Sequence, residues 1–413
     1  MQYPESQAAT VSISSDRSFL WRLCISAWVL RFAIVTLYAV TDAIRQFKLS
    51  PDHMRYDTEG VWVMNAMNYG DFALKSWIDD GWFQFVGLIY YLLWPSPFLI
   101  QLINITLSTL TVIPLFLMVR ELNSDVRVQR FYAVLIAFFP SIMFWSTLML
   151  KDAAGILAVS LVIYGVFVLR QRFALWPLLG LLAGLVIFIG TRTYLLIVIV
   201  MLMPAAFLLF PAGRSRIPWR IIVLPALIGL VPMAIGYGYF ASGEFQRSMY
   251  FDIEYINHVR GAMATGSGAL FEDGSHAWGQ GIGSDIWLAV TTLFAIFVPV
   301  NPFEVANVRQ LAALPFVLMM FYLFPPLIRG LQQMWRSRRL TAPIMIIASG
   351  VLAVYIGGTS NTGALFRWTA QVMPYFLLAI ALTAFVRRRS LLARFATWTV
   401  MAFSQPRRIA AVY

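Results

Sequence analysis

Cysteine, histidine and lysine are all scarce in this chain of 413 residues, which has only one, three and three of them. The single cysteine, Cys24, lies in an apolar run, which excludes a disulfide framework and a cysteine metal site. Three scattered histidines, His53, His258 and His276, are too few for a histidine-rich metal centre. Charged residues make up 12% and hydrophobic residues 60%, a balance typical of a polytopic membrane protein.

The positive net charge does not indicate a nucleic-acid partner. The chain carries a formal charge of +12. Its arginines flank apolar runs in short clusters and do not form one basic face. We therefore expect membrane lipids, and no nucleic acid, around the basic residues.

Apolar runs predict an all-α protein, with residues 1–413 forming one integral membrane domain of about ten transmembrane helices. At about 1.5 Å per residue, each run is long enough to cross most of a hydrocarbon layer of about 30 Å. The first run is too long for a signal-peptide core, and we interpret it as a retained span. The ten predicted spans are 18–41, 98–119, 131–148, 153–169, 174–190, 193–211, 220–240, 310–328, 341–357 and 369–386.

Charges sort between alternate loops of this topology. One set of loops holds fifteen of the nineteen acidic residues and all three lysines, and the opposite set holds most of the arginines in short clusters. Arginine-rich short loops stay cytoplasmic. We therefore expect cytoplasmic termini, a cytoplasmic tail at 390–413 that lies at the interface, and a multi-pass location in a bacterial inner (plasma) membrane.

Two short apolar segments, 82–94 and 286–300, better fit surface helices or hairpins than spans. Placing both on the outer surface leaves two long exoplasmic loops with juxtamembrane helices, at 42–97 and 241–309. We expect the first loop to have a turn-rich start, an amphipathic helix around Glu59–Asn68 and then the apolar hairpin.

The first outer loop concentrates groups that can carry chemistry. Asp52, Asp57 and Glu59 lie beside His53 and Arg55, shortly after the first span. A carboxylate at a membrane surface can deprotonate an acceptor hydroxyl or bind a divalent cation. The alternative is a loop that is polar because it is solvated.

Short stretches along most of the chain follow the first outer loop in a fixed order, although each motif is degenerate. They are Gly60–Asp71, Leu88–Pro97, Leu102–Asn104, Arg120–Leu122, Phe139–Asp152, Phe297–Glu304 and Asn361–Arg367. Their order resembles the C-type (GT-C) integral membrane glycosyltransferases. Within that superfamily the chain is similar to the protein mannosyltransferase and aminoarabinose transferase (family 39-like) group.

The resemblance implies transfer of a sugar from a polyprenyl-phosphate-sugar donor to a glycan, lipid or protein acceptor on the exoplasmic face. It places the catalytic aspartate in the first outer loop, where Asp57 fits best and Asp52 is the second choice. The family often shows an acidic doublet, and this chain has Asp57-Thr58-Glu59 instead, so one carboxylate or two could take part. A divalent cation, Mg or Mn, is a further expectation, with Asp57 and Asp152 as its ligands.

Basic residues that topology does not explain are candidates for binding the lipid phosphate. Lys151 lies in a very short outer turn, where it can stabilise a phosphate leaving group as a point charge. Arg192 and Arg367 stand alone on the outer side, and a guanidinium binds phosphate in a bidentate manner. The alternatives are a snorkelling lysine and arginines bound to lipid headgroups. Arg31, inside the first span, predicts a structural partner.

Two other functions remain open. A polysaccharide polymerase or O-antigen-ligase-like enzyme also uses outer-loop arginines, but it transfers a whole oligosaccharide. A lipid or sugar transporter is disfavoured because Arg31 is nearly alone among charges within the spans and no inverted halves are evident.

Overall fold

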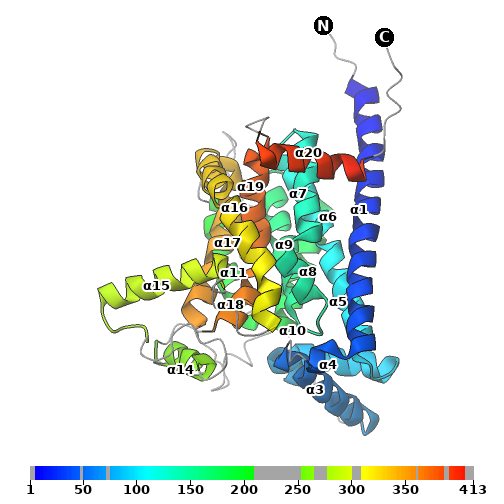
Figure 1. Cartoon of the computed structure of the whole chain (residues 1–413), viewed down its shortest axis with the longest axis vertical. Coiled ribbons are helices and arrows are strands. Elements are labelled where there is room, and N and C mark those ends of the chain that lie inside the picture. Colours follow the sequence, from blue (N-terminus) through cyan, green and yellow to red (C-terminus); the bar gives the residue numbers. More distant parts are fainter. Residues whose placement is uncertain are drawn as a thin grey trace.

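The structure is a computed structural model, and all the elements that it describes are helices (Figure 1). The described residues are 5–46, 50–70, 75–208, 253–264, 277–299, 308–359, 361–385 and 390–404. The predicted span 220–240 lies outside them, as do Glu272, Asp273 and His276 of the second loop.

The first half of the chain forms one long helix, a helical pair and the start of the bundle. These helices are α1 (Glu5–Thr41), α2 (Ala43–Gln46), α3 (Pro51–Asn68), α4 (Lys75–Leu92), α5 (Pro97–Leu110), α6 (Val112–Leu122), α7 (Val126–Phe138), α8 (Pro140–Ser146), α9 (Asp152–Leu169), α10 (Leu175–Thr191) and α11 (Thr193–Leu208). The helix α9 is buried along almost its whole length, so it forms the centre of the bundle.

The second half adds helices around this centre. They are α14 (Ile253–Ala264), α15 (Ile282–Phe297), α16 (Val308–Arg336), α17 (Arg338–Gly358), α18 (Thr362–Thr369), α19 (Met373–Ala384) and α20 (Leu391–Phe403). The helix α19 packs against α16 and α7, and α17 packs against α11.

Among the described residues, five helices are long and apolar enough to cross a membrane, or seven if each of two bent pairs is one span. The five are Asp16–Thr41, Pro97–Leu122, Asp152–Leu169, Ala313–Arg336 and Arg338–Gly358. The bent pairs are α7 with α8 (43°) and α18 with α19 (60°). The predicted spans at 174–190 and 193–211 correspond to the shorter apolar helices α10 and α11. The structure therefore supports a multi-pass membrane protein and does not establish ten spans.

The bend between α7 and α8 follows from a proline. Pro140 is at the first position of α8, and the residue before it, Phe139, is extended with φ −66° and ψ 127°. A proline disfavours helical geometry in the preceding residue, so the run predicted as one straight span at 131–148 breaks there. The break directs α8 toward the turn that precedes α9.

The first outer loop differs from its prediction at two points. The helix α3 begins at Pro51, so the predicted turn-rich start is helical, and the helix runs to Asn68 as expected. Proline at a first helical turn costs no hydrogen bond, because that N–H has no helical partner. The apolar hairpin predicted at 82–94 is wrong as a hairpin: residues 82–92 belong to the single continuous helix α4, which packs along α3.

Figure 1 shows α3 and α4 at one end of the bundle and α20 lying across the other. The predicted interfacial tail is thus helical between Leu391 and Phe403. The predicted surface segment 286–300 lies on α15, which projects from the side of the bundle (Figure 1).

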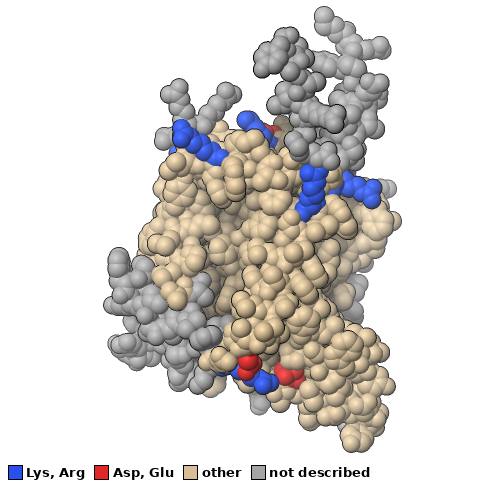
Figure 2. Space-filling view, turned by 45° about the vertical axis from the view of Figure 1, so that its right-hand side comes forward, with Lys and Arg blue, Asp and Glu red and all other residues tan. Residues whose placement is uncertain are grey.

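Apart from Arg31 within α1, the described charged residues of the ion pairs lie toward the two ends of the bundle. At the α20 end, Arg130 pairs with Asp16 (3.2 Å), Arg172 pairs with Glu121 (2.6 Å), and Arg170 donates to the backbone oxygen of Arg339. We call this the arginine end. On the face that Figure 2 shows, a broad uncharged band separates it from charges near the α3 end. The charge sorting of the sequence is thus a spatial separation.

Candidate functional site

A turn between α8 and α9, residues 147–151, forms the frame of the candidate site. Its carbonyl groups accept hydrogen bonds from side chains of α5. Gln101 Nε2 donates to Thr147 O at 2.7 Å, and Asn104 Nδ2 donates to Leu148 O at 2.7 Å and to Leu150 O at 2.8 Å. Buried backbone groups outside a helix need such partners. Two amides in an apolar helix therefore hold the turn.

The turn is also tied to α3 through His53. The Met149 N–H donates to His53 Nδ1 at 3.0 Å. Burial lowers the pKa of His53 to about 4, although the nearby Asp57 carboxylate opposes this. The imidazole is therefore neutral at pH 7, with its proton on Nε2, and it fixes α3 against the turn.

Asp152, the first residue of α9, is fully buried and faces two arginines. One carboxylate oxygen accepts from Arg192 Nη2 at 2.6 Å, and the other lies 3.1 Å from Arg367 Nε. A buried carboxylate requires such partners, because an isolated charge in a medium of low polarity is very costly. Asp152 therefore joins α9, the α10–α11 connection and α18.

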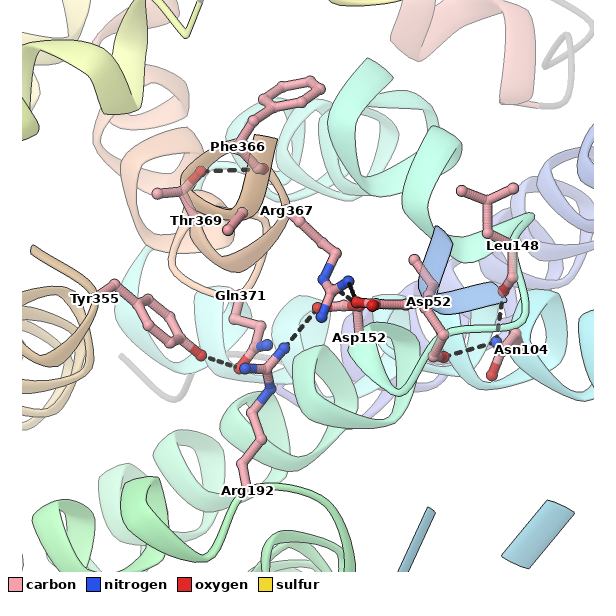
Figure 3. Close-up of polar contacts among 12 residues, drawn as sticks. Asp52, Asn104, Leu148, Asp152, Arg192, Tyr355, Phe366, Arg367, Thr369 and Gln371 are labelled. Carbon is pink, nitrogen blue, oxygen red and sulfur yellow. Dashed lines mark hydrogen bonds and ion pairs between the residues drawn. The ribbon is translucent and has the colours of Figure 1, made fainter. Parts of the chain in front are cut away.

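Arg367 bridges Asp152 to the first outer loop. Its Nη1 pairs with a carboxylate oxygen of Asp52, at the start of α3, and Figure 3 shows the guanidinium between the two aspartates. Asp52 is 44% exposed, whereas Arg367 is 13% exposed. Asp52, Lys151, Asp152, Arg192 and Arg367 form what we call the ion-pair cluster, and three of its five members are cations.

Arg192 is enclosed on every side by its partners. Besides Asp152, its guanidinium donates to Tyr194 Oη at 2.5 Å and stacks over the rings of Tyr355 and Trp368. With its oxygen toward the guanidinium, the Gln371 amide accepts from Arg192 Nε at 2.9 Å. Since Arg192 is 2% exposed, it orients Asp152 and has no free face for a ligand.

Lys151 is the cation of the cluster that forms no ion pair among the described residues. Burial, together with the Arg192 and Arg367 guanidiniums, lowers the pKa of Lys151 to about 8. The ammonium group thus lies in positive surroundings and favours an incoming anion.

Asp57 is not part of the ion-pair cluster, and it is linked to the turn at 147–151 through Tyr90, whose Oη lies 3.7 Å from Met149 Sδ. Successive helical residues are about 100° apart, so Asp52 and Asp57 lie about 140° apart around α3. Asp57 accepts a hydrogen bond from Tyr90 Oη of α4 at 2.7 Å. Burial and this hydrogen bond raise the pKa of Tyr90, so the phenol stays protonated and donates. Asp57 forms no ion pair with the described residues, and one of its oxygens has a fixed orientation.

The structure does not bring all the predicted site residues together. Glu59 is partly buried on α3, without a contact to the ion-pair cluster. The described residues include no group of three histidine, cysteine or acidic side chains that could hold a metal ion. Both oxygens of Asp152 face arginines, an arrangement that does not suit a cation ligand. The proposed metal role of Asp152 therefore does not fit its surroundings.

Several residues of the site were not identified from sequence. Asn104 and Gln101 had a usable signal, because amides within an apolar span need buried partners. Tyr90 and Gln371 had none, since tyrosine at a membrane interface and a lone glutamine between helices are unremarkable in a sequence. Tyr194 follows Arg192 closely but gave no reason to expect contact with its guanidinium.

Comparison with known proteins adds no assignment: neither a protein family, nor a curated protein, nor a solved structure matches this chain.

Proposed function

We propose that this protein is a membrane glycosyltransferase that moves a sugar from a polyprenyl-phosphate-linked donor to an acceptor on the exoplasmic face. The observation that carries this proposal is the ion-pair cluster at one end of an apolar bundle, together with a carboxylate without an ion pair among the described residues, Asp57, on the same helix as Asp52. The proposal includes ten spans, cytoplasmic termini and an exoplasmic location for the α3 end.

Asp57 acts as general base in the proposed reaction. Its carboxylate takes the proton of the acceptor hydroxyl as the acceptor oxygen bonds to the anomeric carbon. The bond between that carbon and the phosphate oxygen breaks, and its electron pair leaves with the polyprenyl phosphate. A single displacement inverts the anomeric centre and needs no second carboxylate as a nucleophile. Tyr90 orients the Asp57 carboxylate by its hydrogen bond.

The cations of the cluster stabilise the departing phosphate. Lys151 contributes a point charge, and Arg367 contributes a guanidinium that is 13% exposed and held by Asp52 and Asp152. Arg192 contributes indirectly, because it holds Asp152. Asp52 pairs with Arg367, so we assign it to positioning and not to proton transfer. We route no step through a divalent cation.

The test is sugar transfer by purified protein in proteoliposomes supplied with polyprenyl-phosphate sugars. We expect Asp57→Asn to lower turnover by at least about 100-fold, since general-base catalysis contributes about 10²–10⁴-fold. Asp42→Asn is the control, because Asp42 is exposed, lies near the same end and has a left-handed φ of 48° that asparagine tolerates.

Full transfer by Asp57→Asn would remove the central assignment. Transfer of a whole oligosaccharide that needs Arg367 but not Asp57 would favour a polymerase or ligase. Counterflow of substrate without covalent turnover would favour a transporter.

A further inference from the structure

The C-terminus of α17 is held by a segment that is distant in sequence. A helix leaves its last four carbonyl groups without helical partners. In α17, which ends at Gly358, two of these groups and the carbonyl of Thr359 accept from one side chain, Arg260 of α14. The N–O distances are 3.1 Å to Ile356, 3.2 Å to Gly357 and 2.7 Å to Thr359.

A tryptophan completes this arrangement. Trp278 Nε1 donates to Gly357 O at 3.0 Å, and the Arg260 guanidinium lies 5.6 Å from the centre of the Trp278 ring. Asn257 of α14 exchanges two hydrogen bonds with the Trp278 backbone, at 2.8 and 3.0 Å. Arg260 is 2% exposed, and a cation at a helix C-terminus is favoured by the helix dipole. We call Asn257, Arg260 and Trp278 the clamp.

The clamp lies directly before the helix that carries Arg367. Arg260 of the clamp contacts the chain as far as Thr359. Two residues later, the Asn361 side chain caps the N-terminus of α18, where it accepts from Gly363 N at 2.9 Å and from Ala364 N at 3.2 Å. This short connection makes the orientation of α18 depend on where α17 ends. Arg367 follows in the second turn of α18.

The second outer loop, which supplies Arg260 and Trp278, also contacts α18 directly. The helix α15 begins at Ile282, soon after Trp278, and its Ile296 packs with Leu365 of α18. In Figure 1, α14 and α15 lie beside the lower ends of α17 and α18. The second loop thus holds α17 at its end and α18 on its side.

We propose that Arg260 is a positioning residue that acts through α18 to hold Arg367 in the ion-pair cluster, with Trp278 as its partner. The positioning role of Arg260 is independent of the proposed function, but the ligand that Arg367 would bind, an anionic phosphate lipid, rests on that proposal. Arg260 does not touch the cluster. It stabilises the end of α17, and the capped connection transmits that position to the Arg367 guanidinium.

Hydrogen–deuterium exchange tests the clamp without reference to function. In the full-length protein, Arg260→Met keeps the length and apolar stem of the side chain but removes its donors. We expect the α18 amides to exchange about tenfold faster or more, because the lost bonds are charge-assisted. The amides of α5 should be unchanged, and Arg260→Lys should restore part of the protection. Arg338→Met is the control, since Arg338 also stacks over a tryptophan, Trp335, at the arginine end.

A double-mutant cycle tests whether Arg260 acts through Arg367. Binding of undecaprenyl phosphate is measured for Arg260→Met, Arg367→Gln and the double variant. We expect each single variant to bind about tenfold more weakly, from the loss of a charged hydrogen bond or of its orientation. The double variant should bind no more weakly than Arg367→Gln alone.

The outcomes separate the two ideas. Unchanged exchange in α18, equal loosening throughout the protein, or additive losses in the cycle would overturn the positioning role. Normal binding by Arg367→Gln would instead overturn the phosphate site, while faster exchange in Arg260→Met would still support the clamp.

Discussion

Asp152 and Arg367 each form two ion pairs, more than the other described residues of the site, and Asp152 is the more deeply buried of the two. Its two oxygens face Arg192 and Arg367, and all three side chains come from different parts of the chain. Arg192 is enclosed by Asp152, Tyr194 and aromatic rings, so the loss of one partner strands a buried charge. The ion-pair cluster therefore stabilises the fold, and it is also a candidate site for an anion.

Replacing Asp152 should therefore destabilise the protein strongly. We expect Asp152→Asn to cost about 3–5 kcal/mol in free energy of unfolding, because it leaves Arg192 buried without its carboxylate. Asp52→Asn should cost about 1 kcal/mol or less, since Asp52 is 44% exposed. Thermal unfolding in detergent measures both. Equal shifts of the two midpoints would contradict the central place of Asp152.

Lys151 predicts a pH dependence of anion binding. With the pKa of Lys151 near 8, the ammonium charge is present below that pH and is lost above it. Undecaprenyl phosphate should thus bind about 10-fold more weakly at pH 9 than at pH 7, a range above the second phosphate pKa of about 6. In the unfolded chain Lys151 regains its ordinary, higher pKa, so between about pH 8 and 10 the unfolded state binds more protons than the folded state. The free energy of unfolding should therefore rise with pH across this range.

The check is to measure the affinity for undecaprenyl phosphate between pH 7 and 9 in the unmodified protein, in Lys151→Met and in Lys151→Arg. The methionine variant should bind weakly without dependence on pH, and the arginine variant should keep its affinity at pH 9. A dependence that survives in Lys151→Met would assign it to another group.

The turn at 147–151 matters most at the scale of elements. It supplies Lys151 and leads into Asp152, yet its carbonyls depend on Gln101 and Asn104 of a neighbouring helix. Buried backbone groups outside a helix need partners of this kind. The position of Lys151 is therefore set largely by α5.

Asn104→Leu should loosen this turn. It leaves two carbonyls, of Leu148 and Leu150, without their side-chain donor, at about 1–3 kcal/mol each. Thr109→Val is a matched control in the same helix, since its hydroxyl bonds only within α5, to Ile105 O. We expect Asn104→Leu to lower both the unfolding midpoint and the affinity for undecaprenyl phosphate, and Thr109→Val to change neither by much. A large effect of the control alone would contradict this view of the turn.

Helices that consist of one long apolar run could be predicted from the sequence. The spans at 18–41, 153–169 and 341–357 each match one helix, because such runs have few alternatives to a buried helix. The span at 98–119 matches α5 and α6, which together form one candidate span, Pro97–Leu122. The bend at Pro140 and the early start of α3 at Pro51 were missed, although both follow from the geometry of proline. The contacts of Arg192 could not be predicted, because Asp152, Tyr355 and Gln371 meet it only through tertiary packing.

The two charged ends define the whole molecule. The described arginines of the arginine end and the ion-pair cluster lie at opposite ends of one apolar bundle. Sequence predicted this separation, since alternate loops of a helical bundle must lie on opposite sides. It also placed Lys151, Asp152, Arg192 and Arg367 on one side. It could not show that Asp52, and not Asp57, joins them, because that depends on the rotation of α3.

Labelling with a membrane-impermeant maleimide tests the proposed orientation. In a Cys24→Ser background, Thr58→Cys of α3 and Ser337→Cys near the start of α17 each place one thiol on the exposed surface. We expect Thr58→Cys to react from outside intact cells with an accessible plasma membrane, and Ser337→Cys to react only after permeabilisation. The opposite pattern would place the ion-pair cluster in the cytoplasm.

Arg31 has a consequence for how the protein is made. Its Nε donates to Ser146 Oγ at 3.1 Å, a partner 115 residues further along the chain, and its Nη2 has no hydrogen-bond partner among the described residues. At roughly 5–20 residues per second, synthesis of those 115 residues takes about 6–23 s. During that interval a guanidinium inside α1 lacks its partner from α8, at an insertion cost of about 2.5–3.5 kcal/mol. The helix α1 is thus synthesised before Ser146, the hydrogen-bond partner of Arg31. During this interval the apolar residues of α1 alone must keep it in the membrane.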